Sequence, residues 1–370
     1  MKKTLVCSAL IAAYAACTAP AAQAQSSVTL YGIIDAGITY FSNLNGHSAF
    51  VANDGSIQSN RWGLTGTEDL GGGLKAIFTL ENGFNLYSGT MVQSGVLFSR
   101  QAWLGLSDDR RGTLTFGKQY DFFWDNLTQF AMGQYAGQYS WHPGDFDHLA
   151  GTLHINNAVK YRSPTFYGVT LGGLYAFPSQ SVSAGTGRVI AFGARYDNGP
   201  LHIGLAYTDT HDLGLNAPTQ AGTTLFPDLP SGPMLAGSMS TFGAGASYRY
   251  GISLTRVLFT NTHFRIRDDN GSMPTYEINE VLQLTPATSV LAGYWHSKLG
   301  EQRWQNGTLL IDYALSKRTD VYTSATYLHV SGGAAPVFLG GGAAPVFVDG
   351  TYVGSGSSST AVRIGMRTRF

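Results

Sequence analysis

Apolar and polar residues alternate along most of the chain in segments of about ten residues, which is the period and length of β-strands with two different faces. The first such segment starts near Val28 and shows the pattern clearly. Its apolar face consists of Val28, Leu30, Ile34, Ala36, Ile38 and Tyr40. Its opposite face consists of Thr29, Tyr31, Asp35 and Thr39. A sheet built from such segments needs two environments, one for each face.

The last segment shows what those two environments are. Its apolar face consists of Val362, Ile364, Met366 and Phe370. Three arginines, Arg363, Arg367 and Arg369, occupy the other face. Because buried charges need water or partners, we interpret the arginine face as lining an aqueous lumen. The apolar face then contacts lipid or a neighbouring subunit.

Composition excludes the other ways of crossing a membrane. Charged residues make up 12% of the chain, about half the share usual in soluble domains, and the chain has 47 glycines and 20 tyrosines. Beyond the first 24 residues, no stretch approaches the roughly 20 apolar residues of a spanning helix. A closed barrel is the remaining solution, because only closure pairs every backbone group within lipid.

The segments add up to about 16 strands, an even number that brings both chain ends to one side of an antiparallel barrel. Their connections are predicted to alternate strictly between tight turns and long loops. Tight turns are predicted at 69–72, 108–112, 197–200 and 315–318. Long loops are predicted at 41–57, 120–154, 210–239 and 330–359. This asymmetry predicts short periplasmic turns and long external loops.

The amino terminus predicts export. Lys2 and Lys3 precede the apolar stretch 5–16, and residues 22–24 form a small-residue cleavage site, so 1–24 read as a signal peptide and 25–370 as the barrel. A lipoprotein signal ending at Cys17 is the alternative. Both cysteines leave with the signal. The mature chain keeps 21 basic and 23 acidic residues, a formal charge of −2 that gives no reason to expect nucleic-acid binding.

Five motifs give the chain a family resemblance. They are SSVTLYGIIDAGI at 26–38, RWGLTGTEDLGGGLKAIFTLENGF at 61–84, SRQAWLGLSDDRRGTLTFGKQYD at 99–121, YALSKRTDVY at 313–322 and IGMRTRF at 364–370. The chain resembles the general-diffusion porins of Gram-negative outer membranes, especially those of β-proteobacteria. The resemblance implies a 16-stranded trimeric barrel whose third external loop folds inward to form a constriction. It also implies a location among outer-membrane lipid and lipopolysaccharide, without a cofactor.

Strand parity and the resemblance together predict the constriction. Parity directs Arg61 inward opposite Trp62, Arg100 inward opposite Trp103, and Lys160 and Arg162 inward opposite their apolar neighbours. By resemblance, Arg61, Arg100 and Lys160 match basic wall positions and Glu81 matches an acid beside them. Asp35 is a further luminal acid by parity. By resemblance, Phe370 is the terminal aromatic residue that the barrel-assembly machinery reads.

The segment from Asp121 to Ile155 is expected to face this wall, because a 35-residue loop is uncommon unless it has a task. Its acids include Asp121 and Asp125, which we place at the constriction. Acids on the loop and bases on the wall would set up a transverse field across the pore. His142, Asp145, Asp147 and His148 offer metal-ligand chemistry, but they form no closed ligand set and loop polarity explains them equally.

The leading function is therefore passive diffusion of ions and small hydrophilic solutes through a water-filled channel with a weak preference for anions. A substrate-specific channel for sugars or small anions is the alternative within transport. A barrel-borne hydrolase and an adhesin are the alternatives from other classes, although no catalytic motif is visible. Glu280 departs from the pattern, because it falls on a face that is otherwise apolar.

Overall fold

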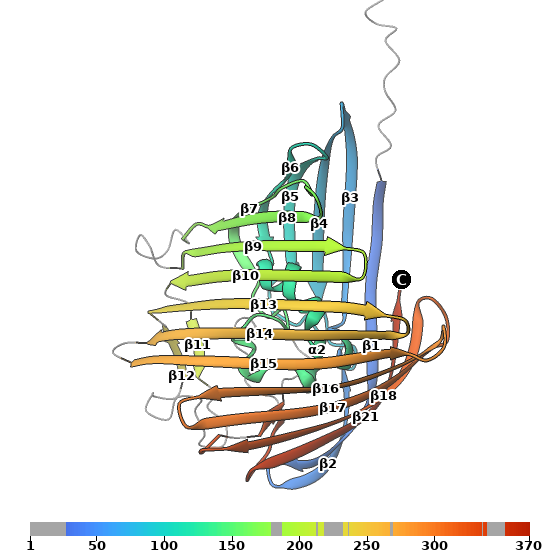
Figure 1. Cartoon of the computed structure of the whole chain (residues 1–370), viewed down its shortest axis with the longest axis vertical. Coiled ribbons are helices and arrows are strands. Elements are labelled where there is room, and N and C mark those ends of the chain that lie inside the picture. Colours follow the sequence, from blue (N-terminus) through green and yellow to red (C-terminus); the bar gives the residue numbers. More distant parts are fainter. Residues whose placement is uncertain are drawn as a thin grey trace, which may run out of the picture.

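The computed structural model describes residues 27–178, 187–211, 214–217, 232–235, 237–266, 269–334, 336–338 and 352–370. The predicted signal peptide therefore lies outside the described residues. One antiparallel sheet of 17 strands dominates the fold (Figure 1). Its strands are β1 (Ser27–Leu44), β2 (His47–Asp54), β3 (Arg61–Gly71), β4 (Leu74–Gly83), β5 (Gln101–Asp108), β6 (Gly112–Gln119), β7 (Ile155–Arg162), β8 (Val169–Ala176), β9 (Val189–Asn198), β10 (Leu201–His211), β13 (Ser238–Tyr250), β14 (Ser253–Ile266), β15 (Asp269–Gln283), β16 (Thr288–Leu299), β17 (Gln302–Ala314), β18 (Thr319–Ser331) and β21 (Ser358–Arg369).

Shorter elements lie in the connections. Two small strand pairs join β11 (Gly214–Ala217) with β12 (Gly232–Leu235) and β19 (Val337–Phe338) with β20 (Tyr352–Val353). The helical segments are η1 (Phe123–Leu127), η2 (Thr128–Phe130), α2 (Gly133–Ala136), η3 (Gln138–Ser140) and η4 (Pro143–Asp145). None of the helices in the described ranges is long and apolar enough to cross a membrane.

The 17 strands fill 16 positions around a closed barrel, which confirms the predicted strand number. Strands β2 and β3 share one position, because β2 pairs with the second half of β1 and β3 pairs with its first half. The other edge of β1 pairs with β21 from Ile33↔Arg369 to Phe41↔Ala361. This seam closes the sheet on itself, so its backbone donors and acceptors are paired within the wall.

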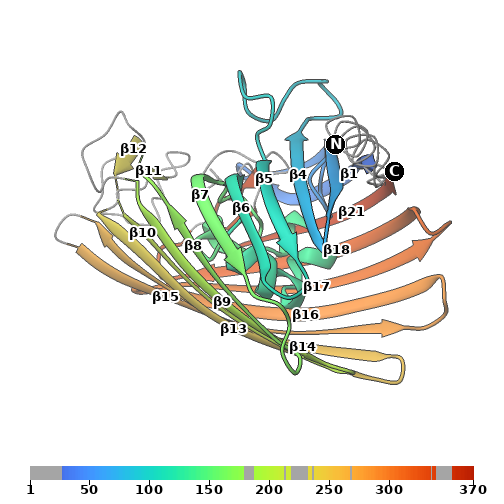
Figure 2. The ribbon, with the colours of Figure 1, turned by 90° about the horizontal axis from the view of Figure 1, so that it is seen from above.

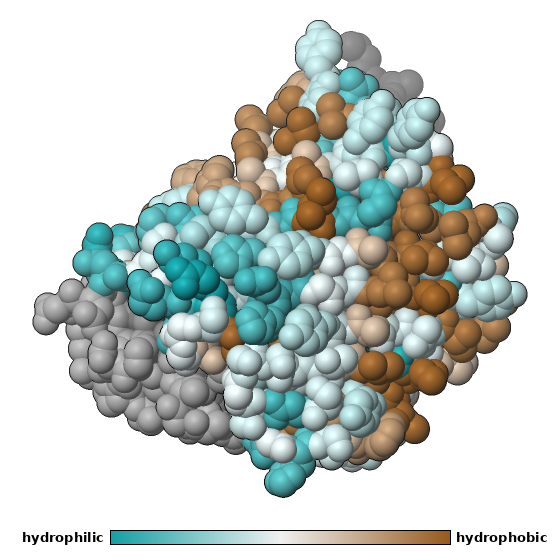
Figure 3. Space-filling view, turned by 60° about the horizontal axis from the view of Figure 1, so that its bottom comes forward, coloured by the Kyte–Doolittle hydropathy of each residue, from teal (hydrophilic) through white to brown (hydrophobic). Residues whose placement is uncertain are grey.

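The two faces of the wall follow the predicted alternation. On β1, Val28, Leu30 and Ile38 face outward and are exposed, whereas Asp35 and Thr39 face inward and are buried. The space-filling view shows apolar side chains gathered in a brown area on the right of the barrel surface (Figure 3). An apolar outer face of this kind is what lipid requires of a transmembrane barrel.

The connections at the two ends of the barrel differ, as predicted, but the strict alternation is wrong. The expected long loop at 41–57 is a hairpin between β1 and β2. Asn45 and Gly46 both have positive φ, 52° and 88°, the geometry of a tight turn that suits the twist of a hairpin. The connection 300–301 at the same end is also tight. The connection between β4 and β5 is long and rises from the rim of the barrel (Figure 2).

The loop 120–154 folds into the barrel and rests on its inner wall, as expected of the third external loop (Figures 1 and 2). Glycines on the wall make room for the large side chains of this loop. A Cβ at Gly172 or Gly193 would collide with the ring of Phe122, and a Cβ at Gly245 would collide with Phe130. The loop therefore lies closer to strands β8–β16 than side chains on the wall would otherwise permit.

Candidate functional site

Glu81 lies between two arginines on the inner wall. Its Oε1 is 2.7 Å from Nε of Arg100, and its Oε2 is 3.7 Å from Nε of Arg61. The hydroxyl of Tyr31 donates a third interaction to Oε2 at 2.9 Å. Tyr31 reaches Glu81 across Gly63, which has no side chain to block it. The wall thus holds two guanidinium groups around one carboxylate.

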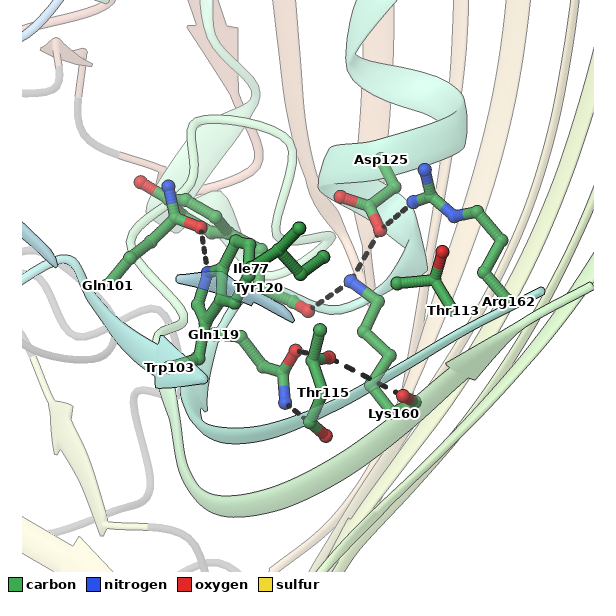
Figure 4. Close-up of a pocket in the computed structure, with 10 residues that line it drawn as sticks. All are labelled: Ile77, Gln101, Trp103, Thr113, Thr115, Gln119, Tyr120, Asp125, Lys160 and Arg162. Carbon is green, nitrogen blue, oxygen red and sulfur yellow. Dashed lines mark hydrogen bonds and ion pairs between the residues drawn. The ribbon is translucent and has the colours of Figure 1, made fainter. Parts of the chain in front are cut away.

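Asp125 of the loop meets two further wall cations. Its Oδ2 forms ion pairs with Nζ of Lys160 and, at 2.5 Å, with Nη2 of Arg162 (Figure 4). Lys160 also donates to the backbone oxygen of Tyr120 at 2.8 Å. The arginine and lysine are two residues apart on β7, so both side chains point to the same side of the wall (Figure 4).

A cavity of about 240 Å³ separates this part of the wall from the start of the loop. Its lining residues are Ile77, Gln101, Trp103, Thr113, Thr115, Gln119, Tyr120, Asp125, Lys160 and Arg162 (Figure 4). Tyr120 joins the cavity to the first cluster, since Nη2 of Arg100 donates to its hydroxyl at 2.6 Å.

The placement of Trp103 corrects the parity argument for β5. Trp103 lines the cavity and pairs with Thr79, so it faces inward and not toward lipid. Arg100 precedes the first residue of β5, where alternation does not apply. Its side chain faces inward, where its Nε donates to Oε1 of Glu81 at 2.7 Å. Arg100 therefore faces inward as predicted, but the predicted opposition to Trp103 is wrong, because both side chains face the lumen.

The two clusters leave a local excess of positive charge. They contain four cationic side chains and two carboxylates, which gives a net charge of +2. The cations are Arg61, Arg100, Lys160 and Arg162, and the carboxylates are Glu81 and Asp125. Arg162 has the most exposed side chain of the four at 46%, and Arg100 is almost fully buried. Of the four cations, Arg162 therefore offers the largest accessible surface.

Asp35 lies within the wall and not in the channel lining. Its carboxylate has no exposed surface and lies 3.1 Å from Nη2 of Arg363. The hydroxyl of Tyr322 and the backbone N–H groups of Ser56 and Ile57 also donate to it. This network joins β1, β18 and β21, so the role that the structure gives Asp35 is to hold the seam of the barrel together.

Asp121 is also fully buried and lies against the wall instead of the lumen. Its Oδ2 accepts from Thr208 of β10 at 2.7 Å and pairs with Nδ1 of His148 at 2.8 Å. Burial raises the pKa of Asp121, but the partnership with His148 and the hydrogen bonds outweigh it and hold that pKa below its usual value. Asp121 therefore stays ionised and fastens the start of the loop.

His142 fastens the middle of the loop to the wall. Its Nδ1 lies 2.5 Å from Asp147, and its Nε2 lies 2.8 Å from Glu277 of β15. Asp147 also accepts from the hydroxyl of Thr260 on β14. Burial lowers the pKa of His142, but Asp147 and Glu277 outweigh it and raise that pKa to about 10. Both ring nitrogens thus bind carboxylates, and the bond to Glu277 holds the loop against the wall.

The other potential metal ligands also serve the loop. Asp145 accepts from the backbone N–H of Ala150 and from Thr152, and the partner of His148 is Asp121. Within the described residues, no group of three His, Cys, Asp or Glu side chains has the arrangement of a metal site.

The anchor at His142 gives a pH-dependent prediction. Since its pKa is raised, its stabilisation is complete below the unfolded value of about 6.5 and is lost as pH rises through the folded value. We expect His142→Gln to lower the free energy of unfolding by about 3 kcal/mol at pH 6. The difference between the variant and the parent should shrink as pH approaches 10. Urea unfolding of both proteins from pH 6 to 10 measures this difference in the free energy of unfolding. A difference that stays constant over this range contradicts the role of protonated His142 as an anchor.

Two functional residues of the wall escaped the sequence reasoning. Glu277 forms an ion pair with His142 of the loop, and the guanidinium of Arg256 packs over the ring of Tyr135 at 3.7 Å. Both face inward with Asn279, which pairs with Arg256 across β14 and β15. The signal was available, because Glu277 and Asn279 share one face of a strand whose other face carries Tyr276 and Ile278.

Two other wall cations have partners that the sequence did not indicate. Arg367 lies 3.0 Å from Asp320 and 3.7 Å from Asp312. Arg195 lies 2.6 Å from Asp197 on the same strand. These pairs offset the charges of Arg367 and Arg195, whereas the clusters near Arg61 and Arg162 keep an excess of positive charge.

Known proteins resemble the chain in sequence. Residues 9–333 match the Gram-negative porin family. An outer membrane porin protein of Bordetella pertussis is 33% identical over 71% of this chain and 70% of its own length. Outer membrane porin protein 32 of Delftia acidovorans is 31% identical over 100% of both chains.

Solved structures share the fold. The anion-selective porin from Comamonas acidovorans superposes with a TM-score of 0.76 at 26% identity, covering 94% of this chain and 100% of that one. The trimer form of OmpT, an outer membrane protein of Vibrio cholerae, superposes with a TM-score of 0.67 at 16% identity over 93% and 99% of the two chains, which shows the fold alone. This chain therefore belongs to the Gram-negative porin family and forms a water-filled channel of the outer membrane for passive diffusion of ions and small hydrophilic solutes.

Proposed function

We propose that this channel has a weak preference for anions. The observation that carries the proposal is the excess of two positive charges in the clusters at Glu81 and Asp125. A similar solved structure is described as an anion-selective porin, which supports the same direction. The preference stays weak because Glu81 and Asp125 each lie within a cluster and offset part of the field.

The proposed constriction consists of Arg61, Glu81, Arg100, Asp125, Lys160 and Arg162. The loop brings the Asp125 carboxylate into direct contact with Lys160 and Arg162 (Figure 4). Arg61 and Arg100 surround Glu81 on the neighbouring part of the wall. Such an arrangement orders water and favours polar solutes able to align with the field. An apolar solute must displace strongly held water and is disfavoured.

Zero-current potentials in a KCl gradient across a planar bilayer test the selectivity. We expect an anion-selective sign at low salt that decreases in magnitude at 1 M, where the Debye length is about 3 Å. A cation-selective sign would contradict the proposal. Saturable block by one sugar or small anion would favour the substrate-specific channel instead. Ester or peptide turnover, or a closed barrel, would favour the hydrolase or the adhesin.

We also propose that the channel assembles as a homotrimer after removal of residues 1–24, in contact with lipopolysaccharide. The exposed apolar side chains of Ile38, Val362 and Ile364 lie on neighbouring strands of the seam and suit subunit packing. Cross-linking in mild detergent should stop at three chains, and N-terminal sequencing should start near Gln25. A monodisperse monomer would refute the trimer.

Phe370 is proposed to help closure and recognition by the barrel-assembly machinery. Its backbone exchanges two hydrogen bonds of 3.1 Å with Gly32, and its ring covers the position that a Gly32 side chain would occupy. Deleting Phe370 should reduce the amount of protein in the outer membrane. An unchanged rate of insertion in cells would refute this role.

A further inference from the structure

Glu280 places a carboxylate on the outer face of the barrel. It pairs with Thr255 of β14 and Ala292 of β16, and these strands lie side by side at the front of Figure 1. Its strand neighbours Glu277 and Asn279 are buried on the inner face, whereas Ile278 is 54% exposed on the outer face. The predicted departure from the apolar pattern is therefore real, and the register of β15 is regular here.

The carboxylate is oriented by hydroxyls and not by a cation. Ser253 donates to its Oε1, and Thr255 donates to its Oε2 at 2.5 Å. In the described part of the chain, no lysine or arginine forms an ion pair with it. The cation of the neighbouring strand, Arg256, faces the lumen, where it packs over Tyr135. Two donated hydrogen bonds leave further acceptor positions on Glu280 open to the membrane.

Glu280 lies at the level of lipid headgroups on the periplasmic side. It is four residues from the start of the periplasmic turn 284–287. In the same cross-strand row, Tyr248 pairs with Thr255 and is 51% exposed, and Tyr250 nearby is 79% exposed. Exposed tyrosines mark the interface between hydrocarbon and water in such barrels.

An apolar groove begins beside Glu280. It has a volume of about 540 Å³ and runs over the outer faces of β13–β16. Val257 and Ile278, each two residues further from the periplasmic turns than Thr255 and Glu280, line its near end, and Ala244 and Ala246 line it with small side chains. The groove thus extends from the headgroup level toward the middle of the membrane.

We propose that Glu280 and this groove bind one phospholipid whose headgroup carries a primary ammonium, such as phosphatidylethanolamine. The ammonium donates to Glu280 in a charge-assisted hydrogen bond, and one acyl chain fills the groove. Charge complementarity selects this lipid, because an anionic headgroup would be repelled and a quaternary ammonium has no N–H to donate. The bound lipid neutralises a charge that would otherwise face hydrocarbon.

Native mass spectrometry of the purified protein tests the site. The protein is titrated with dioleoyl phosphatidylethanolamine, phosphatidylcholine and phosphatidylglycerol, and each variant is first shown to conduct in a planar bilayer. We expect phosphatidylethanolamine to bind about tenfold more tightly than phosphatidylcholine to the parent protein. Glu280→Gln should reduce this ratio to about one. Glu68→Gln, at another exposed outward carboxylate, is the matched control and should retain the preference.

A second variant keeps the proposal testable if Glu280→Gln fails to fold. Ala246→Phe fills the groove from the outer face and should weaken binding of both zwitterionic lipids. Equal binding of these lipids to the parent protein, or a preference that survives Glu280→Gln, would overturn the proposal. So would binding of phosphatidylglycerol that requires Mg²⁺ and Glu280, which indicates a cation bridge. A change of oligomeric state in Glu280→Gln without a change in lipid binding would assign the residue to a subunit contact and equally overturn it.

Discussion

Replacing Arg61 and Arg100 together by serine should turn the channel from weak anion preference toward cation preference and raise its conductance. The substitution removes both positive charges of the local excess and leaves Glu81 without its ion pairs. Lys160 and Arg162 still share Asp125. We expect the ratio of anion to cation permeability to fall about five- to tenfold, which corresponds to about 1–1.4 kcal/mol. The increase in conductance follows mainly from the loss of the Arg61 side chain, which is the more exposed of the two.

The measurement is the zero-current potential in a KCl gradient, together with single-channel conductance. Arg110→Ser with Arg111→Ser is the matched control, because it removes the same charge from an exposed periplasmic turn. A triple variant that adds Glu81→Gln separates loss of the arginines from exposure of the carboxylate. The zero-current potential of this triple variant should lie between those of the parent and the double variant. A double variant with the parent's zero-current potential would refute the assignment of this cluster to the constriction.

Asp35→Ala should destabilise the barrel far more than the loss of any exposed ion pair. Asp35 and Arg363 are both fully buried, so removing the carboxylate leaves the guanidinium inside the wall with hydrogen bonds but no opposite charge. Breaking a buried pair in this way costs about 3–5 kcal/mol. Urea unfolding from detergent micelles measures the loss.

Two further variants serve as comparisons for the loss of stability in Asp35→Ala. Asp197→Ala breaks a partly exposed pair with Arg195 and should cost at most about 1 kcal/mol. Asp35→Leu combined with Arg363→Met removes both charges and should recover much of the stability lost by Asp35→Ala. If Asp35→Ala loses no more than Asp197→Ala, the seam does not depend on this pair.

The inward and outward faces of the wall could be predicted from the sequence, because the alternation of side chains along a strand is local. Neighbouring residues show which side chains share a face, so the outward positions of β1 and β21 follow directly. The same reasoning failed at Trp103, because alternation was carried across the start of β5 into the preceding loop. It also failed at 41–57, predicted as a long loop, where the end of β1, an Asn45-Gly46 turn and strand β2 form a hairpin.

The partners of charged residues could not be predicted in the same way. Asp35 and Arg363 are 328 positions apart, and only closure of the barrel brings them together. Asp121 meets Thr208 because the loop folds back onto β10. Parity shows that such residues face inward, but burial depends on what packs over them. Facing the lumen and lining the channel are therefore different properties.

The glycines under the loop 120–154 separate two features of the channel that sequence change could alter independently. Gly245 sets how far Phe130 sinks into the wall, and thereby the width left open opposite it. The charged side chains at Glu81 and Asp125 lie on other strands or at the start of the loop. A larger residue at Gly245 would push Phe130 into the passage and narrow it without replacing any of these charged side chains. Size exclusion and ion preference thus have separate structural determinants in one barrel.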